Sequence, residues 1–212
     1  DRWKDRSGLG EGAGGAARYT WQYLAAGYAA VWATENTREA VFDAMTRRET
    51  YGTSGTRLTV RFFGGYGFTP ADAQSRYLAE VGYTKGVPMG GDLKPATGGE
   101  APTFLVAALK DPQGANLDRI QVIKGWLDAS GTAQEKVYDV VWAGDRKPTK
   151  DGRLPPVGDT VDVARATYTN TIGAAELTAV WKDPDFKPGQ RAFYYARVIE
   201  IPTPRWTAYD QA

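Results

Sequence analysis

Three arginines surround a short turn that could bind an anion. Arg47 and Arg48 precede the sequence Thr53-Ser54-Gly55, and Arg57 follows it. Backbone amides and hydroxyl groups in such a turn can hold an anionic group, and guanidinium groups add charge-assisted hydrogen bonds. We therefore predict that Ser54 and Arg57 bind substrate. The alternative is that these residues belong to a solvated helix end and the start of a strand.

Two further charged residues lie in a segment rich in glycine and proline, residues 82–93, which we expect to be an ordered loop. Lys85 and Asp92 would be presented there on a short backbone. Arg205 follows in the sequence Pro202-Thr203-Pro204-Arg205-Trp206, an extended tail that we expect to lie across the body of the protein. We predict that Lys85, Asp92 and Arg205 also orient substrate. Ordinary surface ion pairs are the alternative.

Histidine and cysteine are both absent from the 212 residues. Ser-His-Asp triads, Cys-His pairs and histidine-based zinc sites are therefore excluded within this chain. Carboxylate pairs remain, but Asp43 with Glu49, and Asp139 with Asp145, have no spacing beyond chance. We accordingly predict neither a catalytic residue nor a metal ligand among these residues.

The charge balance argues against two classes of partner. Lys and Arg number 26 against 25 Asp and Glu, so the net charge of +1 offers no electrostatic attraction for nucleic acid or an anionic membrane. No apolar run approaches the roughly 18 residues of a membrane span. The first residues lack the pattern of a signal peptide, so any export signal would have been removed. The compartment stays open.

The first 57 residues predict a flexible arm followed by helical structure. Residues 8–17 are almost all Gly and Ala, whereas residues 19–34 are apolar and aromatic and need a surface to pack against. Residues 37–50 have helical spacing, with Asn36 as the cap and Glu39 three residues beyond it. We therefore predict a first unit, residues 1–57, that contains an arm and a helical layer.

Short strands with turn signals between them dominate residues 58–212. Leu58, Val60 and Phe62 alternate with polar residues, and the set Ala196, Val198 and Glu200 alternates with Tyr195, Arg197 and Ile199. The other strands are expected at residues 103–110, 117–126, 135–143, 160–169 and 176–181. The predicted fold class is thus α+β, an N-terminal helical layer followed by a mainly antiparallel, immunoglobulin-like β-sandwich without a disulfide.

Several motifs of the chain resemble a known family. They are Val31-Trp32-Ala33-Thr34-Glu35-Asn36-Thr37-Arg38-Glu39-Ala40, Arg48 to Arg57, Arg61-Phe62-Phe63-Gly64-Gly65, Gly86 to Leu93, and Glu200-Ile201-Pro202-Thr203-Pro204-Arg205-Trp206. Together they resemble the domain-of-unknown-function family numbered three-six-zero-four, and the resemblance covers essentially the whole chain.

This resemblance implies a longer protein. The N-terminal portion of family members is similar to metallohydrolases of the polymerase-and-histidinol-phosphatase type, which bind divalent metals through His, Asp and Glu. The present chain resembles only the C-terminal third, so no metal ligand carries over to it. The resemblance also implies that residues 19–57 form the last helical layer of the metallohydrolase barrel, with the turn at Thr53-Ser54-Gly55 near the metal cleft.

Our first expectation is therefore the C-terminal portion of a metal-dependent hydrolase of a phosphoester or another small-molecule ester. The divalent metal and the catalytic groups would lie in the preceding portion of the same protein, and export is implied by the resemblance alone.

A second expectation is a non-catalytic β-sandwich that supports another domain or binds a partner or polysaccharide. An exposed row of aromatic residues on one sheet face would favour it, and burial of Trp126, Trp142 and Trp181 between the sheets would count against it. A third alternative, a carboxylate enzyme, requires acidic pairs in one pocket with perturbed titration.

Overall fold

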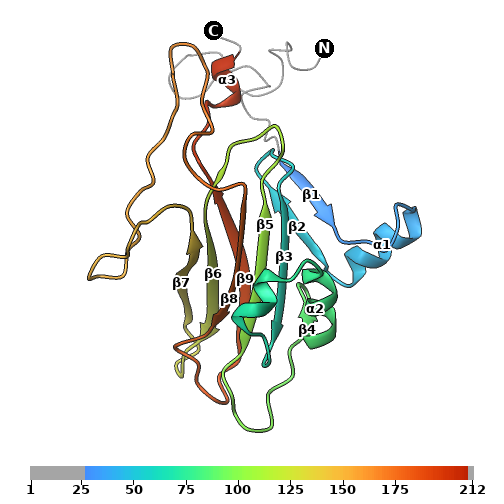
Figure 1. Ribbon diagram of the computed structural model, residues 1–212. Coiled ribbons are helices and arrows are strands. Elements are labelled where there is room, and N and C mark those ends of the chain that lie inside the picture. The colour runs from blue at the N-terminus through green and yellow to red at the C-terminus, as the bar shows by residue number, and fades with distance from the viewer. Residues whose placement is uncertain (1–26, 210–212) are drawn as a thin grey trace, which may run out of the picture.

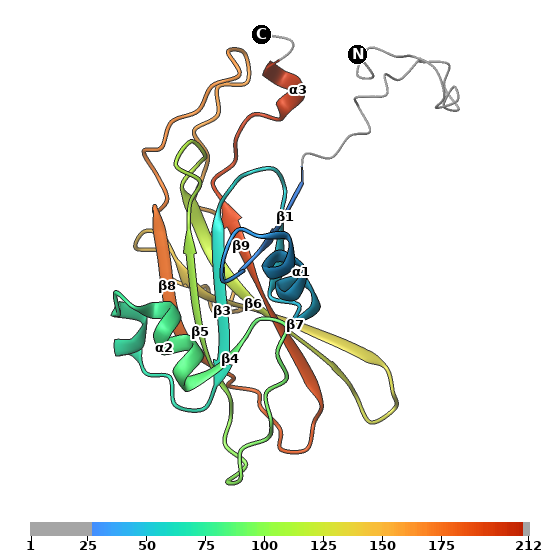
Figure 2. The same ribbon diagram turned by 90° about the vertical axis from the view of Figure 1, so that its right-hand side faces the viewer.

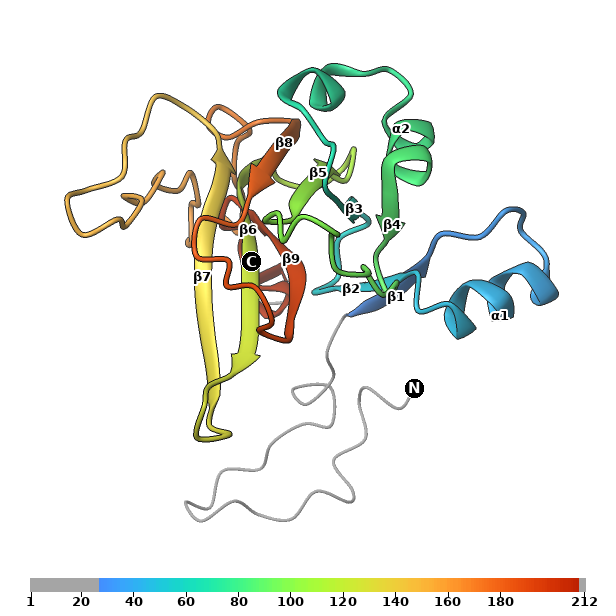
Figure 3. The same ribbon diagram turned by 90° about the horizontal axis from the view of Figure 1, so that it is seen from below.

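A computed structural model describes residues 27–209, which form a β-sandwich with a projecting arm (Figure 1). One sheet contains, in order, β4 (Gly86–Pro88), β3 (Thr59–Gly65), β5 (Thr103–Leu109) and β8 (Glu176–Lys182). The other contains β7 (Ala133–Trp142), β6 (Leu117–Leu127) and β9 (Ala192–Glu200). All pairings are antiparallel, and the two sheets pack on each other, with β7 and β6 running lengthwise beside β8, β5 and β3 in the view from below (Figure 3).

The projecting arm corrects the predicted fold class. It consists of β1 (Tyr28–Val31), α1 (Arg38–Thr46) and β2 (Thr50–Thr53), and the two strands pair as a third antiparallel sheet. The expectation of an N-terminal helical layer is therefore wrong, because strands flank a single helix of nine residues. The protein is mostly β. Residues 1–26, with the predicted Gly/Ala arm and half of the apolar stretch, lie outside the described residues.

Local chemistry explains why the helix is shorter than predicted. Its cap is Thr37 rather than Asn36, since the backbone N–H of Ala40 donates to Thr37 Oγ1 at 3.3 Å. Arg48 adopts a left-handed conformation with φ of 62°, which an α-helix does not accommodate. The following residues, 50–53, include β-branched and aromatic side chains that favour a strand.

The alternation predicted for β3 is confirmed. Val60 and Phe62 are buried, whereas Thr59 and Arg61 lie on the opposite, half-exposed face. β4 pairs only with residues 63–65, so the first half of β3 would be an open edge. Side chains of the arm cap it, since Trp32 Nε1 donates to the carbonyl of Val60 at 2.8 Å and Tyr51 Oη to that of Leu58 at 3.2 Å.

The main core lies between the two large sheets. Its buried side chains come from both of them, namely Phe62, Phe104, Val106, Ala108, Leu117, Ile120, Val122 and Leu177. A second cluster covers the outer face of the four-stranded sheet, where Phe63 and Leu105 pack against η3 (Pro70–Gln74) and α2 (Leu78–Lys85). Figure 2 shows these helices on that side. The molecule thus has a short helical cover, two sheets and the arm.

Five of the strands predicted beyond β3 are confirmed within a few residues, and one is wrong. Residues 160–169 form no strand and contain only the bridge between Asp162 and Thr167. Thr160 Oγ1 instead donates to the carbonyl of Thr169, and side-chain bonds of this kind compete with a sheet ladder.

The segment predicted as a loop, residues 82–93, contains the end of α2 and β4. No described helix is long and apolar enough to cross a membrane.

Candidate functional site

Ser54 and Arg57 lie in the connection between β2 and β3, where the predicted domain boundary also falls. Both residues are exposed, and neither lines either of the two hollows described below. The backbone N–H of Arg57 donates to Asp111 Oδ2 at 2.7 Å, and this bond, together with that from Gln113, lowers the pKa of Asp111. The guanidinium of Arg57 lies 5.9 Å from the centre of the Tyr28 ring. Contacts with Asp111 and Tyr28 therefore fix the turn between β2 and β3 to the rest of the protein.

Lys85 has a structural partner. Its Nζ atom lies 2.7 Å from Asp72 Oδ1 and 2.9 Å from Oδ2, and Asp72 also accepts the backbone N–H of Thr69 at the start of η3. The hydrogen bond from Lys85 is the largest cause of the lowered pKa of Asp72, followed by that from Thr69. Lys85 therefore ties the end of α2 to the first turn of η3.

The remaining two predicted residues are exposed at separate places. Asp92 lies 3.8 Å from Arg48 at the far end of the arm, and Arg205 follows β9. Lys85 and Arg57 lie beyond opposite ends of β3, a strand of seven residues, and are therefore roughly 20 Å apart. The structure does not bring Ser54, Arg57, Lys85, Asp92 and Arg205 together in one site, and their binding roles stay predictions.

A groove of about 570 Å³ lies on the outer face of the four-stranded sheet, beside the part that η3 and α2 cover. Thr59, Ala107 and Thr178 line it from three strands, and Trp32 reaches it from the arm. Residues between and within the two helices also line it, namely Gln74, Ser75, Arg76, Leu78 and Ala79. The groove is thus assembled from elements that are far apart in the sequence.

Arg61 provides a fixed positive charge in this groove. Its guanidinium carbon lies 3.5 Å from the centre of the Trp32 ring, and Nη1 bonds to Tyr83 Oη at 3.2 Å. Tyr83 in turn donates to the buried carboxylate of Glu49. Burial first, and Glu49 second, raise the pKa of Tyr83, so the phenol stays protonated. A guanidinium has five N–H donors, which allows Arg61 to bind an anion as well.

Sequence reasoning did not include this groove among the candidate sites. The alternation in β3 places Arg61 on the outward face, which was a usable signal. Arg76 also lines the groove and is exposed. It lies in the connection between η3 and α2, and no sequence pattern indicated that this connection would lie near β3. The lining offers hydrogen bonds and two guanidinium groups against the single carboxylate of Glu176, so it can hold an anionic group.

Glu200 is a second residue that sequence reasoning missed. Thr56 Oγ1 donates to its Oε2 atom at 2.8 Å, whereas Oε1 is buried and has no hydrogen-bond partner among the described residues. Burial raises the pKa of Glu200. The available signal was its position in β9 on the same side as the apolar Ala196 and Val198. Glu200 lines neither hollow. It therefore does not provide the pair of acidic residues in one pocket that a carboxylate enzyme requires.

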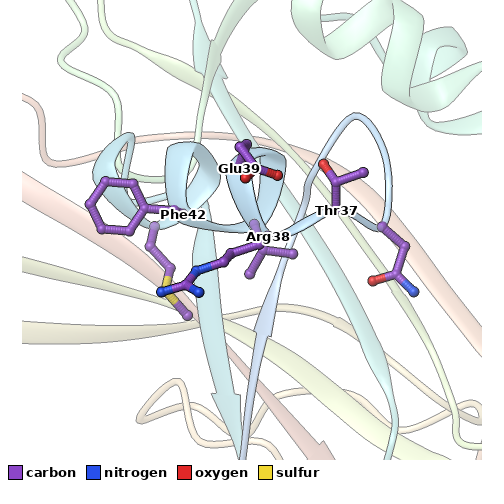
Figure 4. A pocket seen from close by; sticks show the side chains of 7 residues that line it. Thr37, Arg38, Glu39 and Phe42 are labelled. Atoms are coloured by element: carbon purple, nitrogen blue, oxygen red, sulfur yellow. The ribbon is translucent and has the colours of Figure 1, made fainter.

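The exposed side of α1 forms the other hollow, of about 610 Å³. Arg38 and Phe42 extend from the helix, and Thr37 lies at its start (Figure 4). Phe42 is 71% exposed and Met45 is 51% exposed, while Ala44 on the other side is fully buried. The helix therefore rests on the body through a small contact and presents its large apolar side chains outward.

Comparison with known proteins gives one match. A family model described as a protein of unknown function, DUF3604, matches residues 3–212. The chain belongs to the DUF3604 family. No curated protein and no solved structure is significantly similar to it.

This DUF3604 chain also contains a buried ionic cluster between its two sheets. Lys124 Nζ lies 2.6 Å from Asp183 Oδ2, and the exposed fractions of the two side chains are 2% and 0%. Tyr194 Oη donates to the same carboxylate at 2.7 Å, and burial followed by Asp183 raises the pKa of that phenol. Because every polar group here has a partner inside the protein, the cluster fastens the strands rather than exposing a reactive group.

Proposed function

We propose that these residues are the C-terminal, non-catalytic portion of a metal-dependent hydrolase that acts on a phosphoester or another small-molecule ester. The support is the resemblance of the motifs at residues 31–40, 61–65 and 200–206 to a longer family with a metallohydrolase-like N-terminal portion. Membership of DUF3604 over residues 3–212 agrees with that resemblance but names no activity.

The described residues do not fit the metal itself. Within residues 27–209 no three His, Cys, Asp or Glu side chains are placed to hold an ion together. The proposal therefore assigns the divalent metal to the preceding portion of the protein and assigns no catalytic step to the residues described. Their contribution is attachment to that portion and, through Arg61 and the groove, binding of an anionic group.

The observation that carries the proposal is the outward apolar side of α1. A surface helix in a self-contained domain turns its large apolar side chains inward. Here Phe42 and Met45 are exposed on the projecting arm, and Figure 4 shows Phe42 extending from the helix. The arm is the first described element, and residues 1–26 connect it in the sequence to whatever precedes them in a longer protein. We assign the exposed side of α1 to packing against that preceding portion.

The proposal is tested by comparing the longer natural protein with the 212-residue chain. Metal content is measured by inductively coupled plasma mass spectrometry, and hydrolysis is measured with p-nitrophenyl phosphate and p-nitrophenyl acetate. We expect bound divalent metal and ester hydrolysis in the longer protein only. Hydrolysis by the 212-residue chain, or a longer protein with neither metal nor activity, would refute the proposal.

Attachment through α1 is tested with two matched variants. Phe42→Ser and Tyr77→Ser remove side chains that are each 71% exposed, the first on α1 and the second beside α2. Each variant of the chain is mixed with the separately produced preceding portion, and the complex is measured by native mass spectrometry. We expect Phe42→Ser to weaken the complex by about tenfold or more, the effect of losing one buried aromatic side chain, and Tyr77→Ser to leave it unchanged. Equal behaviour of the two variants would contradict the assignment.

A further inference from the structure

Two aromatic side chains lie next to each other on the outer face of the three-stranded sheet. Phe193 and Tyr195 are two residues apart on β9, and they are 63% and 41% exposed. Their ring centres are 6.3 Å apart and their planes differ by 12°. Val137, on β7, is 40% exposed and belongs to the same face. The face therefore carries two nearly parallel rings that solvent can reach.

Both rings lie against the sheet rather than standing out from it. Phe193 is opposite Gly125 on β6, and a Cβ atom at that position would lie 2.5 Å from Phe193 Cε1 and 3.0 Å from Cε2. The ring thus rests on a backbone that has no side chain. Tyr195 is opposite Ile123, which is fully buried although it lies outside the main core. Each ring therefore covers the sheet with one side and presents the other to solvent.

A row of polar side chains crosses the same face directly beside the rings. Arg197, two residues beyond Tyr195, donates from Nε to Gln121 Oε1 at 2.9 Å. Gln121 donates from Nε2 to Asp139 Oδ1 at 2.7 Å. Asp139 also lies 3.4 Å from Arg119 Nη1. These bonds hold the row in place. Gln121 is only 9% exposed and the Asp139 side chain only 15%, so the exposed Arg197 is the member of the row that solvent reaches.

We propose that this face binds a polysaccharide chain, which goes beyond the hydrolase proposal and does not depend on it. The faces of aromatic rings are electrostatically negative, and the C–H groups on the flat side of a sugar ring are weakly positive, so the two stack. Two parallel rings along one strand fit two sugar units of a chain. Arg197, two residues beyond Tyr195 on the same strand, lies where the hydroxyl groups of a third unit would need hydrogen bonds.

This arrangement fits a carbohydrate better than an apolar protein segment. A protein helix or strand would bury the rings under apolar side chains, but it would also cover the exposed guanidinium of Arg197 and leave that charge without water. A sugar chain supplies stacking surfaces and hydroxyl groups together. The amphipathic strip on β9 and β6 matches that combination.

The test is native affinity electrophoresis of the 212-residue chain in gels that contain xylan, mixed-linkage β-glucan, dextran or alginate. We expect at least one of these polymers to retard the wild-type chain. Phe193→Ala and Tyr195→Ala should each lower the association constant by about two- to tenfold, the effect of losing one aromatic contact. Tyr77→Ala, which removes a 71% exposed aromatic side chain from another part of the surface, should migrate as the wild type does.

Three results would overturn the inference. The first is that none of the four polymers retards the wild-type chain. The second is that Phe193→Ala and Tyr195→Ala are retarded as strongly as the wild type. The third is that the wild-type chain is a dimer by native mass spectrometry and Tyr195→Ala makes it a monomer, because the face would then be an interface between two copies. Circular dichroism of each variant verifies that the fold is retained.

Discussion

Replacing Asp183 by alanine should lower the free energy of unfolding by about 3 to 5 kcal/mol, the cost of leaving a buried charge without its partner. The side chain of Lys124 is only 2% exposed. In the variant, its Nζ atom would keep only the hydrogen bond to the carbonyl of Asp185, at 2.9 Å. Tyr194 would lose the acceptor of its hydroxyl group. Because Tyr194 lies between Phe193 and Tyr195 in the sequence of β9, the cluster also holds the strand on which the proposed carbohydrate face depends.

The loss is measured by urea unfolding and by thermal unfolding. At an unchanged m-value, the midpoint concentration of urea should fall in proportion to the free energy. For a chain of about 200 residues, each kcal/mol lowers the melting temperature by about 2 to 4 °C, so Asp183→Ala should melt roughly 6 to 20 °C below the wild type.

A nearby exposed pair provides the matched control. Lys136 Nζ lies 2.5 Å from Asp185 Oδ2, and the two side chains are 51% and 47% exposed. Lys136→Ala should cost no more than about 1 kcal/mol, because water screens the pair. The double variant Lys124→Met with Asp183→Leu should cost less than Asp183→Ala, since it removes both charges and retains apolar volume. If Asp183→Ala costs no more than Lys136→Ala, the reasoning is refuted.

Three further predictions concern single positions. Gly82→Ala should destabilise the protein by about 1 to 3 kcal/mol in a urea titration, because the new Cβ atom would lie 2.5 Å from the Phe63 ring, and an unchanged midpoint would contradict the packing described. Lys85→Ala should cost under 1 kcal/mol at pH 7. Since folding lowers the pKa of Asp72, this contribution is fully present above about pH 4 and should disappear as the pH falls below about 4 and through that lowered pKa, which thermal melts at several pH values would detect. Glu200→Gln should stabilise the protein by about 1 kcal/mol at pH 7; since folding raises the pKa of Glu200, the wild type regains this stability as the pH falls below that raised pKa, and a difference independent of pH would count against the assignment.

The strands were largely predictable from the sequence, because alternation of apolar and polar residues depends on only a few neighbouring positions. Val60 and Phe62 lie inward and Arg61 outward, as that pattern predicts. The helical layer was not predictable in the same way. Residues 28–53 satisfy helical spacing in part, and they become a hairpin with a short helix because β1 finds β2 as a partner.

The predicted binding residues illustrate the same limit. Ser54, Arg57, Lys85 and Asp92 were selected for charge or hydroxyl groups in glycine-rich segments, and the structure distributes them over both ends of β3 and the end of the arm. Arg61 and Arg76 are 15 positions apart and line one groove because a sheet and a pair of short helices meet there. The local amino-acid composition does not indicate that these helices pack beside that sheet.

The sequence by itself determined that no histidine or cysteine chemistry is available in this chain, that most of it forms antiparallel strands, and that it belongs to DUF3604. The first conclusion rests on which residue types the chain contains, and the second on the alternation of apolar and polar residues along each strand. The third rests on the similarity of the sequence to the family model. Only the tertiary structure decided that Arg61 stacks on Trp32, that Lys85 is paired with Asp72, and that the Phe193 ring lies over Gly125. Each of these contacts joins residues that are far apart in the sequence, and their approach depends on how whole strands and helices pack, which no local pattern specifies.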